Sequence, residues 1–406
     1  MVTLIFLVSW PITLEEINLR YDIGLFKQRG CEYKVLDLSQ ILNGRALRET
    51  KILSEIKGDF VVKVKSYKEL EKAIKEATPN SIFIDTIVHL SDLNFKHERI
   101  FRILKQCNVR YIVISAGALP TPKPTATVGK WVKVTKPKLV INFILKKLII
   151  LLRKNTRIYP QPLRIFGGNS DALNRYITNF KEMENSITRI HSWDYNIYLD
   201  YIQETKVIDE SEDEVRDNYC VFLDEAATHH PDFAILGIKY LDESEYYENM
   251  KKLFFSIEKE TGLKVVIAAH PRSQYDLSAK VFGEREIIKG QTIRLVAKSS
   301  LVVAHVSTSL SFSVLFKKPV MLVKTTEMIG LEFWNSIDEF ARELGLSVQY
   351  TEDHTSLMRF LSDYNSAINP MYNSYKYKYI KSIDAQDLKV WDIIINYLEV
   401  EARGVS

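Results

Sequence analysis

The chain has 406 residues, of which 46% are hydrophobic and 26% are charged, a balance typical of globular proteins. This composition excludes a disordered chain and a small disulfide-stabilised scaffold, and the length allows two domains or one large one. The three cysteines are far apart and form neither a CxxC pair nor a zinc-binding spacing, so we expect reduced thiols in a cytoplasmic protein.

The net charge of +4 conceals a local concentration of basic residues. Ten lysines and arginines, and no Asp or Glu, lie between Lys123 and Arg157, so the rest of the chain is net acidic. No nucleic-acid reading motif accompanies this segment, and we therefore expect no nucleic-acid partner. The segment contains a helix over residues 138–154 that is too apolar for an ordinary surface helix and too interrupted by charge to span a bilayer.

A basic, hydrophobic helix of this kind fits the interface of an anionic membrane. The alternative is a core helix whose lysines reach solvent along their apolar stems. At the start of the chain, residues 1–10 carry neither a basic region nor a cleavage site, so they predict a first strand rather than a signal peptide.

The first half of the chain alternates short apolar runs with helical patterns, which favours a mainly parallel sheet. Its predicted strands are Thr3–Val8, Tyr33–Leu38, Asp59–Val64, Ser81–Thr86, Arg110–Ser115, Leu163–Phe166 and Ser186–Ile190. Its predicted helices are Glu15–Arg29, Tyr67–Glu76, His97–Cys107 and the basic helix, which follows a Pro- and Thr-rich loop at Thr121–Thr127.

The second half repeats this alternation after an acidic, polar linker. Its predicted strands are Cys220–Leu223, Lys264–Ala269, Leu301–Ala304 and Pro319–Val323. Its predicted helices are Glu243–Thr261, Gln291–Lys298, one beginning at Ser309, Leu331–Gly345, His354–Ser362 and Ala385–Glu401.

The pattern predicts an α/β protein with two Rossmann-like domains facing a cleft. The first domain covers residues 1–203, the linker residues 204–218 and the second domain residues 219–406. In open parallel sheets, ligands bind beyond the carboxyl ends of the strands. The residues that follow each predicted strand are therefore the candidates for function.

The strand Lys264–Ala269 ends in His270-Pro271-Arg272. A histidine donates to phosphate or sugar oxygens, proline fixes the backbone of the turn, and an arginine offers a planar cationic donor suited to phosphate. A capped turn with a surface arginine is the alternative interpretation.

The strand Leu301–Ala304 is followed by Ser307-Thr308-Ser309, which opens a helix. Hydroxyl residues cap the free N–H groups of a helix, and the same N–H groups bind phosphate. An ordinary N-cap is the alternative for these three residues taken alone. The chain has neither a Walker lysine motif nor GxGxxG, so a P-loop NTPase or a common dinucleotide enzyme is not expected.

Taken together, the His270-Pro271 turn and the Ser307-Thr308-Ser309 helix start resemble motifs of bacterial sialyltransferases and related capsule glycosyltransferases, which have the GT-B fold. In those enzymes, the histidine and the Ser/Thr residues bind the phosphate of a CMP-activated sugar. The resemblance covers Tyr219 to Val323 and implies that the second domain binds the nucleotide and the first domain serves the acceptor. Leu223-Asp224-Glu225-Ala226 is the nearest string to the acidic motif that supplies the base in these enzymes, and it lacks their glycine.

The resemblance implies an inverting, metal-independent glycosyltransferase that takes a CMP-linked, sialic-acid-like nonulosonate as donor and a glycan or glycolipid as acceptor. It would build a bacterial capsule or lipopolysaccharide from the cytoplasm, with a peripheral position at the inner membrane face as an option. A CDP-glycerol glycerophosphotransferase, which the same two features also resemble, is the first alternative. A nucleotide-sugar 2-epimerase and a non-catalytic scaffold of a polysaccharide assembly complex are the others.

An inverting transferase needs a base that removes a proton from the acceptor hydroxyl. Asp224 is the first candidate because it follows a strand, and Asp194 is the second because aromatic residues surround it in the sequence. Asp85, at the end of an earlier strand, ranks third. His229 and His230 have no partner ligands at a diagnostic spacing, so we expect neither a metal nor another cofactor.

Overall fold

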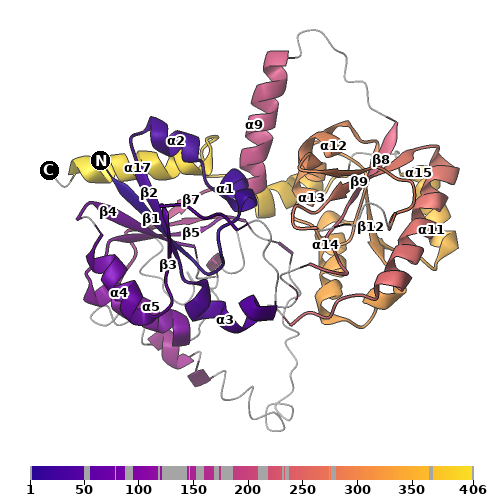
Figure 1. Cartoon of the computed structure of the whole chain (residues 1–406). Coiled ribbons are helices and arrows are strands. Elements are labelled where there is room, and N and C mark those ends of the chain that lie inside the picture. The colour runs from indigo at the N-terminus through magenta and orange to yellow at the C-terminus, as the bar shows by residue number, and fades with distance from the viewer. Residues whose placement is uncertain are drawn as a thin grey trace. The chain divides into compact units, whose positions relative to one another are not determined.

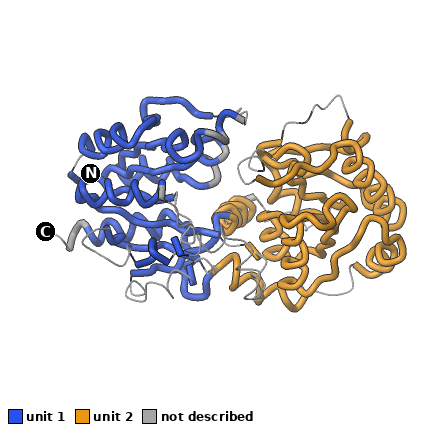
Figure 2. The backbone as a smooth tube through the Cα atoms, turned by 90° about the horizontal axis from the view of Figure 1, so that it is seen from below, with its two compact units in different colours: residues 1–118, 123–193, 382–406 blue, residues 119–122, 194–381 orange. Residues whose placement is uncertain are grey.

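The chain forms two compact units, shown in different colours in Figure 2. Unit 1 comprises residues 1–118, 123–193 and 382–406, and unit 2 comprises residues 119–122 and 194–381. The computed structural model describes residues 2–49, 55–77, 79–86, 95–117, 119–120, 144–145, 147–151, 160–168, 173–174, 186–208, 218–230, 233, 237–273, 275, 280–364 and 369–404. The predicted loop at Thr121–Thr127 lies outside these residues, as does most of the predicted linker.

Unit 1 contains a seven-stranded parallel sheet with the order β3-β2-β1-β4-β5-β6-β7 (Figure 1). The strands are β1 Thr3–Val8, β2 Glu32–Asp37, β3 Val61–Lys63, β4 Ser81–Asp85, β5 Tyr111–Ser115, β6 Arg164–Gly167 and β7 Ile187–Arg189. The helices described in this unit include α1 Leu14–Arg20, α2 Ile23–Gln28, α3 Ser39–Glu49, α4 Tyr67–Lys75, α5 Phe95–Gln106 and α17 Val390–Gly404.

Successive side chains of β1 point to opposite faces of this sheet, as the period of a strand requires. Ile5 and Leu7 belong to a core shared with α3, α4 and α5. Leu4 and Phe6 belong to a second core, which contains the buried Trp391 of α17. The sheet is therefore buried on both faces, which explains why its strands are apolar throughout.

Unit 2 contains a six-stranded parallel sheet with the order β10-β9-β8-β11-β12-β13. The strands are β8 Tyr219–Leu223, β9 Lys264–Ala269, β10 Ile287–Lys289, β11 Leu301–Ala304, β12 Val320–Lys324 and β13 Val348–Tyr350. The helices of this unit are α9 Trp193–Ile208, α11 Glu243–Thr261, α12 Thr292–Lys298, α13 Leu310–Leu315, α14 Ser336–Leu344, α15 His354–Asp363 and α16 Tyr372–Tyr375, with 3₁₀ turns at Thr326–Met328 and Glu332–Asn335 and a π-helical turn at Lys376–Ile380.

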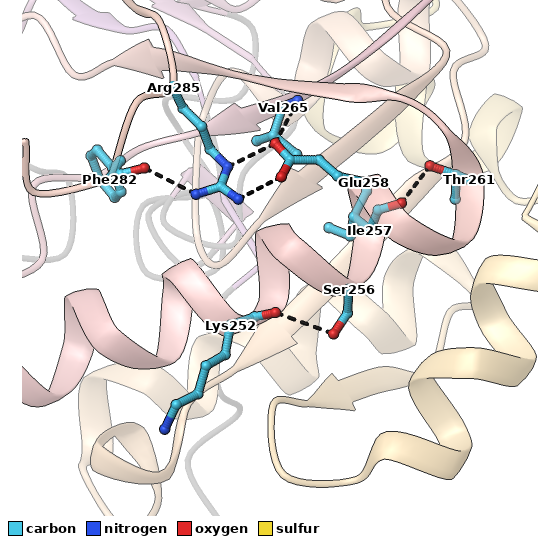
Figure 3. A network of polar contacts seen from close by, with 8 residues as sticks. All are labelled: Lys252, Ser256, Ile257, Glu258, Thr261, Val265, Phe282 and Arg285. Atoms are coloured by element: carbon cyan, nitrogen blue, oxygen red, sulfur yellow. Dashed lines mark hydrogen bonds and ion pairs between the residues drawn. The ribbon is translucent and has the colours of Figure 1, made fainter.

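A bidentate ion pair fixes α11 to the segment before β10 (Figure 3). The Arg285 Nε and Nη2 atoms donate to the two carboxylate oxygens of Glu258 at 2.8 and 2.6 Å, and Nη1 donates to the Phe282 carbonyl at 3.1 Å. The Val265 N–H of β9 donates to the same carboxylate at 3.4 Å. Paired donors of this kind set position as well as distance, so the contact links α11, the start of β9 and the segment before β10.

Three of the predicted helices are wrong in their extent: Ala385–Glu401 begins only at Val390, and two others differ as follows. The predicted helix Glu15–Arg29 is two helices, because Tyr21 is extended and the Asp22 side chain accepts from the Leu25 N–H to begin α2. The predicted helix Leu331–Gly345 starts with a 3₁₀ turn, and α14 begins only at Ser336. Both boundaries depend on local backbone conformation and, at α2, on a side-chain cap, which hydrophobic periodicity does not report.

The division into units also differs from the predicted partition at its end. Helix α17 belongs to unit 1, where the Trp391 Nε1–H donates to the Arg20 carbonyl at 2.6 Å and the indole lies 5.5 Å from the Phe6 ring. Helix α9 from Asp194 onward belongs to unit 2. The apolar stripe of α17 finds its partners at the start of the chain, a pairing that sequence order does not indicate.

Among the described helices, none combines the length and the hydropathy that crossing a bilayer requires.

Candidate functional site

Three predicted strand ends lie side by side at one edge of the unit 2 sheet. Strand β8 pairs with β9 on one side, through Leu223 opposite Ala268, and with β11 on the other, through Leu223 opposite Ala304. Because all three strands are parallel, the residues that follow them meet at the same edge. The strand order reverses between β8 and β11, and such a switch point is where parallel sheets open a ligand crevice.

The turn after β9 fixes the protonation of His270. The Arg272 N–H donates to His270 Nδ1 at 3.1 Å, so in the neutral ring the proton must be on Nε2. Burial, together with the neighbouring His230 and Arg272, lowers the pKa of His270 to about 3. His270 is therefore a neutral imidazole that donates through Nε2, and Pro271 and Arg272 belong to the same turn.

Asp224 lies beneath this turn and is 4% exposed. Its Oδ2 accepts from the Ala226 N–H at 3.1 Å, from the His270 N–H at 3.4 Å and from the Tyr275 hydroxyl. Its Oδ1 is buried and accepts no hydrogen bond. Burial raises the pKa of Asp224, while the three donors and the nearby His229 act against that rise.

Tyr275 is a site residue that sequence reasoning missed. Burial and the charge of Asp224 raise the pKa of this phenol, so it remains a donor to the carboxylate. No sequence motif marks it, because its role depends on a contact 51 positions along the chain.

The turn after β8 needs an unusual backbone conformation. Ala226 has a φ of 52°, in the left-handed region that glycine adopts most readily. It occupies the position where the acidic motif of the resembling enzymes has glycine. Alanine holds this conformation at a cost in strain that glycine would avoid.

Glu225 is buried as well. The N–H groups of His305 and Val306 face its carboxyl, but neither oxygen has a partner at full hydrogen-bonding geometry. Burial and the charge of Asp224 raise the pKa of Glu225 well above its usual range. Asp224 and Glu225 thus form an adjacent pair in which Glu225 retains its proton more strongly.

The loop after β11 is anchored by a fully buried histidine. His305 Nδ1–H donates to the Val323 carbonyl at 2.7 Å, and its Nε2 accepts from the Tyr246 hydroxyl at 3.1 Å. Burial lowers the pKa of His305 to about 4, so the ring is neutral. Both nitrogens are occupied, and His305 shapes the loop rather than offering a donor to a ligand.

The helix start at Ser307-Thr308-Ser309 provides fewer donors than the sequence suggests. The Ser309 N–H donates to the Ser307 hydroxyl at 3.2 Å, and the next three N–H groups donate to the carbonyls of residues 307–309. Thr308 is exposed, and within the described part of the chain its N–H and hydroxyl make no hydrogen bond. Thr308, the most exposed of the three residues, is therefore the most accessible donor of this loop.

Histidine and aromatic rings extend the same edge. The His230 ring lies 4.6 Å from that of His270 and is stacked on Phe233 at 5.3 Å, and the His229 ring lies 5.3 Å from that of Tyr275. His229 Nδ1 is 2.9 Å from the Thr228 hydroxyl, and burial lowers the pKa of this imidazole. Among the residues that the structure describes, no three His, Cys, Asp or Glu side chains gather as a metal site would require.

The two remaining candidate bases lie elsewhere. Asp194 is in the first turn of α9, and burial, the nearby Tyr379 and the charge of Asp194 raise the pKa of Tyr375. Asp85 is the last residue of β4 in unit 1 and is 1% exposed. The structure brings Asp224 together with the predicted nucleotide-binding turn, through the His270 N–H, whereas Asp85 and Asp194 belong to β4 and α9.

Comparisons with known proteins establish the fold. No protein-family model and no curated protein matches the chain. A structure of S. aureus MnaA with UDP has a TM-score of 0.50 at 13% identity, covering 99% of this chain and 96% of that one. A candidate UDP-N-acetylglucosamine 2-epimerase from Listeria monocytogenes has a TM-score of 0.50 at 13% identity, covering 99% and 97% of the two chains.

The wall teichoic acid polymerase TagF gives a TM-score of 0.49 at 12% identity, covering 98% of this chain and 89% of that chain, a similarity too weak to support an assignment. None of these three structures is a sialyltransferase, so they do not test the resemblance to that family. The similarity to the first two confirms the predicted fold class: the chain has two parallel α/β sheets of Rossmann-like type in a GT-B-like fold.

Proposed function

We propose that the chain is an enzyme that uses a nucleotide-activated sugar and that unit 2 binds the nucleotide. The observation that carries this proposal is the edge of the unit 2 sheet, where His270, Asp224 and the Ser307-Thr308-Ser309 loop follow three adjacent strands. The fold similarity to a protein solved with UDP supports the same class of ligand. We further propose that the donor is a CMP-linked, sialic-acid-like nonulosonate and that the product is a bacterial surface glycan.

The phosphate of the donor is proposed to bind between the turn after β9 and the loop after β11. His270 supplies a neutral N–H donor, and Thr308 supplies a hydroxyl and a backbone N–H. Arg272 supplies the positive charge of the turn. Neutral donors fixed by the backbone hold a phosphate without requiring protonation at neutral pH, and we propose that binding is metal-independent.

Asp224 is proposed to remove the proton from the acceptor hydroxyl, leading to inversion at the sugar carbon. Three donors hold Oδ2, which orients the carboxylate and leaves Oδ1 as the oxygen that takes the proton. Because Oδ1 is buried, the acceptor must reach it past the side chains that cover it. If Asp224 is not the base, the geometry offers His229, a neutral imidazole beside Tyr275.

A 2-epimerase is the second candidate, favoured by the fold similarity to a candidate UDP-N-acetylglucosamine 2-epimerase. A glycerophosphotransferase and a non-catalytic scaffold are the remaining readings. These four functions differ in the substrate that they use and in the product that they release. A transferase frees CMP from a CMP-sugar when an acceptor is present, and a glycerophosphotransferase frees CMP from CDP-glycerol. An epimerase converts a UDP-sugar to its 2-epimer without any acceptor.

The decisive experiment incubates the protein with CMP-sugars, UDP-sugars and CDP-glycerol, with and without glycan acceptors, and measures released nucleotide and isomerised sugar. Acceptor-dependent release of CMP from a CMP-nonulosonate supports the proposal, and isomerisation of a UDP-sugar replaces it with the epimerase. A parallel panel measures thermal stability with CMP, UMP and CDP, since a ligand that binds the folded state raises its stability. If no nucleotide stabilises the protein and none is released, the scaffold reading stands.

A further inference from the structure

A short helical segment between β5 and β6 has apolar side chains on opposite faces. Residues 144–145 and 147–151 are helical in the described structure. Ile149 is 1% exposed, and Ile150 packs against the unit 1 core that α3, α4 and α5 share. One face of the segment is therefore part of the core, as the core-helix interpretation of the sequence expected.

The other face is apolar but exposed. The exposed fractions are 58% for Ile144, 47% for Leu148 and 67% for Leu151. Positions four and seven residues apart lie on one side of a helix, so these three side chains form a stripe. A surface helix of a water-soluble unit normally places polar residues there. The exposed stripe is thus a feature that folding of the unit does not use.

The charge of the surrounding sequence indicates what covers this stripe. The segment from Lys123 to Arg157 carries ten basic residues and no acidic one. Large aliphatic side chains beside basic residues match the boundary between acyl chains and anionic headgroups. A second copy of the chain would bring the same positive segment opposite itself, which is unfavourable. Protein partners prefer aromatic and arginine anchors, whereas the stripe is purely aliphatic.

We propose that Ile144, Leu148 and Leu151 insert into an anionic lipid bilayer surface, to which the positive charge of the surrounding sequence attracts the chain. This docking is independent of the nucleotide chemistry of unit 2. It makes unit 1 the part of the chain that holds the protein at a membrane. It also specifies the side chains responsible, which the sequence pattern alone did not separate from the core-facing ones.

The test measures sedimentation of the full chain with vesicles of phosphatidylcholine, alone or mixed with phosphatidylglycerol. The wild type is expected to bind only the mixed vesicles and to be partly released by high salt, which screens the headgroup attraction. Leu148→Glu and Leu151→Glu are each expected to weaken binding about tenfold, the factor for withdrawing one leucine from apolar surroundings. Leu14→Glu is the matched control, because Leu14 is 57% exposed in unit 1 but lies in α1.

A second variant tests the proposal through a gained fluorescence signal rather than through a loss of vesicle binding. Leu151→Trp is expected to bind the mixed vesicles at least as well as the wild type and to show a blue-shifted fluorescence difference spectrum with them alone. Thermal unfolding of each variant checks that it is folded. The proposal is overturned if the wild type ignores the mixed vesicles, if both glutamate variants bind as it does, or if the tryptophan spectrum does not change. It is also overturned if the glutamate variants alter only self-association.

Discussion

The two sheets of the molecule are built on the same plan. In unit 1 the central strands are β2-β1-β4, and in unit 2 they are β9-β8-β11, with the first strand of each unit between the second and the fourth. Each order reverses beside the first strand, so each unit has a switch point at the carboxyl edge of its sheet. The topology alone therefore gives the chain two equivalent places for a ligand.

The residues at the two edges differ in how their polar groups are used. In unit 1, the Thr86 hydroxyl donates to the Leu7 carbonyl at 2.8 Å, which joins the end of β4 to β1, and Asp37 accepts from the Ser39 N–H at 2.9 Å, which closes the turn after β2. In unit 2, the Asp224 carboxylate accepts from the His270 N–H at 3.4 Å and from the Tyr275 hydroxyl, so it joins the ends of β8 and β9, and Glu225 is buried beside it. Topology determines where a crevice can open, and side chains determine which chemistry it supports.

The largest expected effect is on the rate of transfer, and it distinguishes the strand edge of unit 2 from that of unit 1. Asp224→Asn should lower the rate of sugar transfer by about 10²–10⁴-fold, as loss of a general base does. Donor affinity should fall by a smaller factor, because the His270 N–H loses part of its acceptor. Asp85→Asn is the matched control, with equal burial at the end of β4. Initial rates of transfer and the nucleotide Kd measure these effects. If D85N loses transfer and D224N keeps it, the base that removes the proton is at the unit 1 edge.

Removing the proposed phosphate donor should have the next largest effect. His270→Ala is expected to weaken nucleotide binding about ten- to a hundredfold, the loss of a hydrogen bond to a charged group. Thr308→Ala should act in the same direction by less, since its backbone N–H remains. His354→Ala, at the exposed start of α15, should leave binding unchanged. Calorimetric titration with CMP measures all three, and wild-type affinity in a folded H270A variant would exclude the turn as the nucleotide site.

The third prediction concerns the group that orients Asp224. Tyr275→Phe removes its hydroxyl donor and should lower the free energy of unfolding by about 1–3 kcal/mol, because a buried carboxylate loses a partner. Tyr247→Phe is the control, since that hydroxyl contacts Thr228 at 3.2 Å rather than a carboxylate. Denaturant titration of both variants checks the difference. An equal effect of the two changes would show that Asp224 does not depend on Tyr275.

The smallest effect is a pH dependence at Glu225. Its pKa is raised in the folded protein, so the folded state retains a proton that the unfolded chain has lost, and this carboxyl destabilises the fold as pH rises above its usual range. Glu225→Gln does not titrate, so the melting temperature of the variant relative to wild type should be higher at about pH 8 than at about pH 5. The lowered pKa values of buried His270 and His305 have the opposite effect, because they destabilise the fold as pH falls. Both histidines are present in the variant and in the wild type, so their contribution cancels in this comparison. A difference that does not change with pH would mean that Glu225 is ionised in the fold.

The sequence by itself determined the elements around the site. The predicted strands Lys264–Ala269 and Leu301–Ala304 coincide with β9 and β11, and Cys220–Leu223 lies within β8. Apolar runs of this length are a local property of the chain and are legible without tertiary contacts. The same local reading placed His270 and the hydroxyl loop at strand ends, and the alternation of elements predicted the fold class.

Only the tertiary structure decided which strand ends are neighbours and how their side chains interact. The contact of Tyr275 with Asp224, the burial of Glu225 and the membership of α17 in unit 1 all join residues that sequence spacing does not relate. The same holds for the basic helix, where one apolar face packs in the core and the other is exposed. Hydrophobic periodicity predicts whether a segment forms a helix or a strand. The burial of that segment and its contact partners depend on which other parts of the chain pack against it.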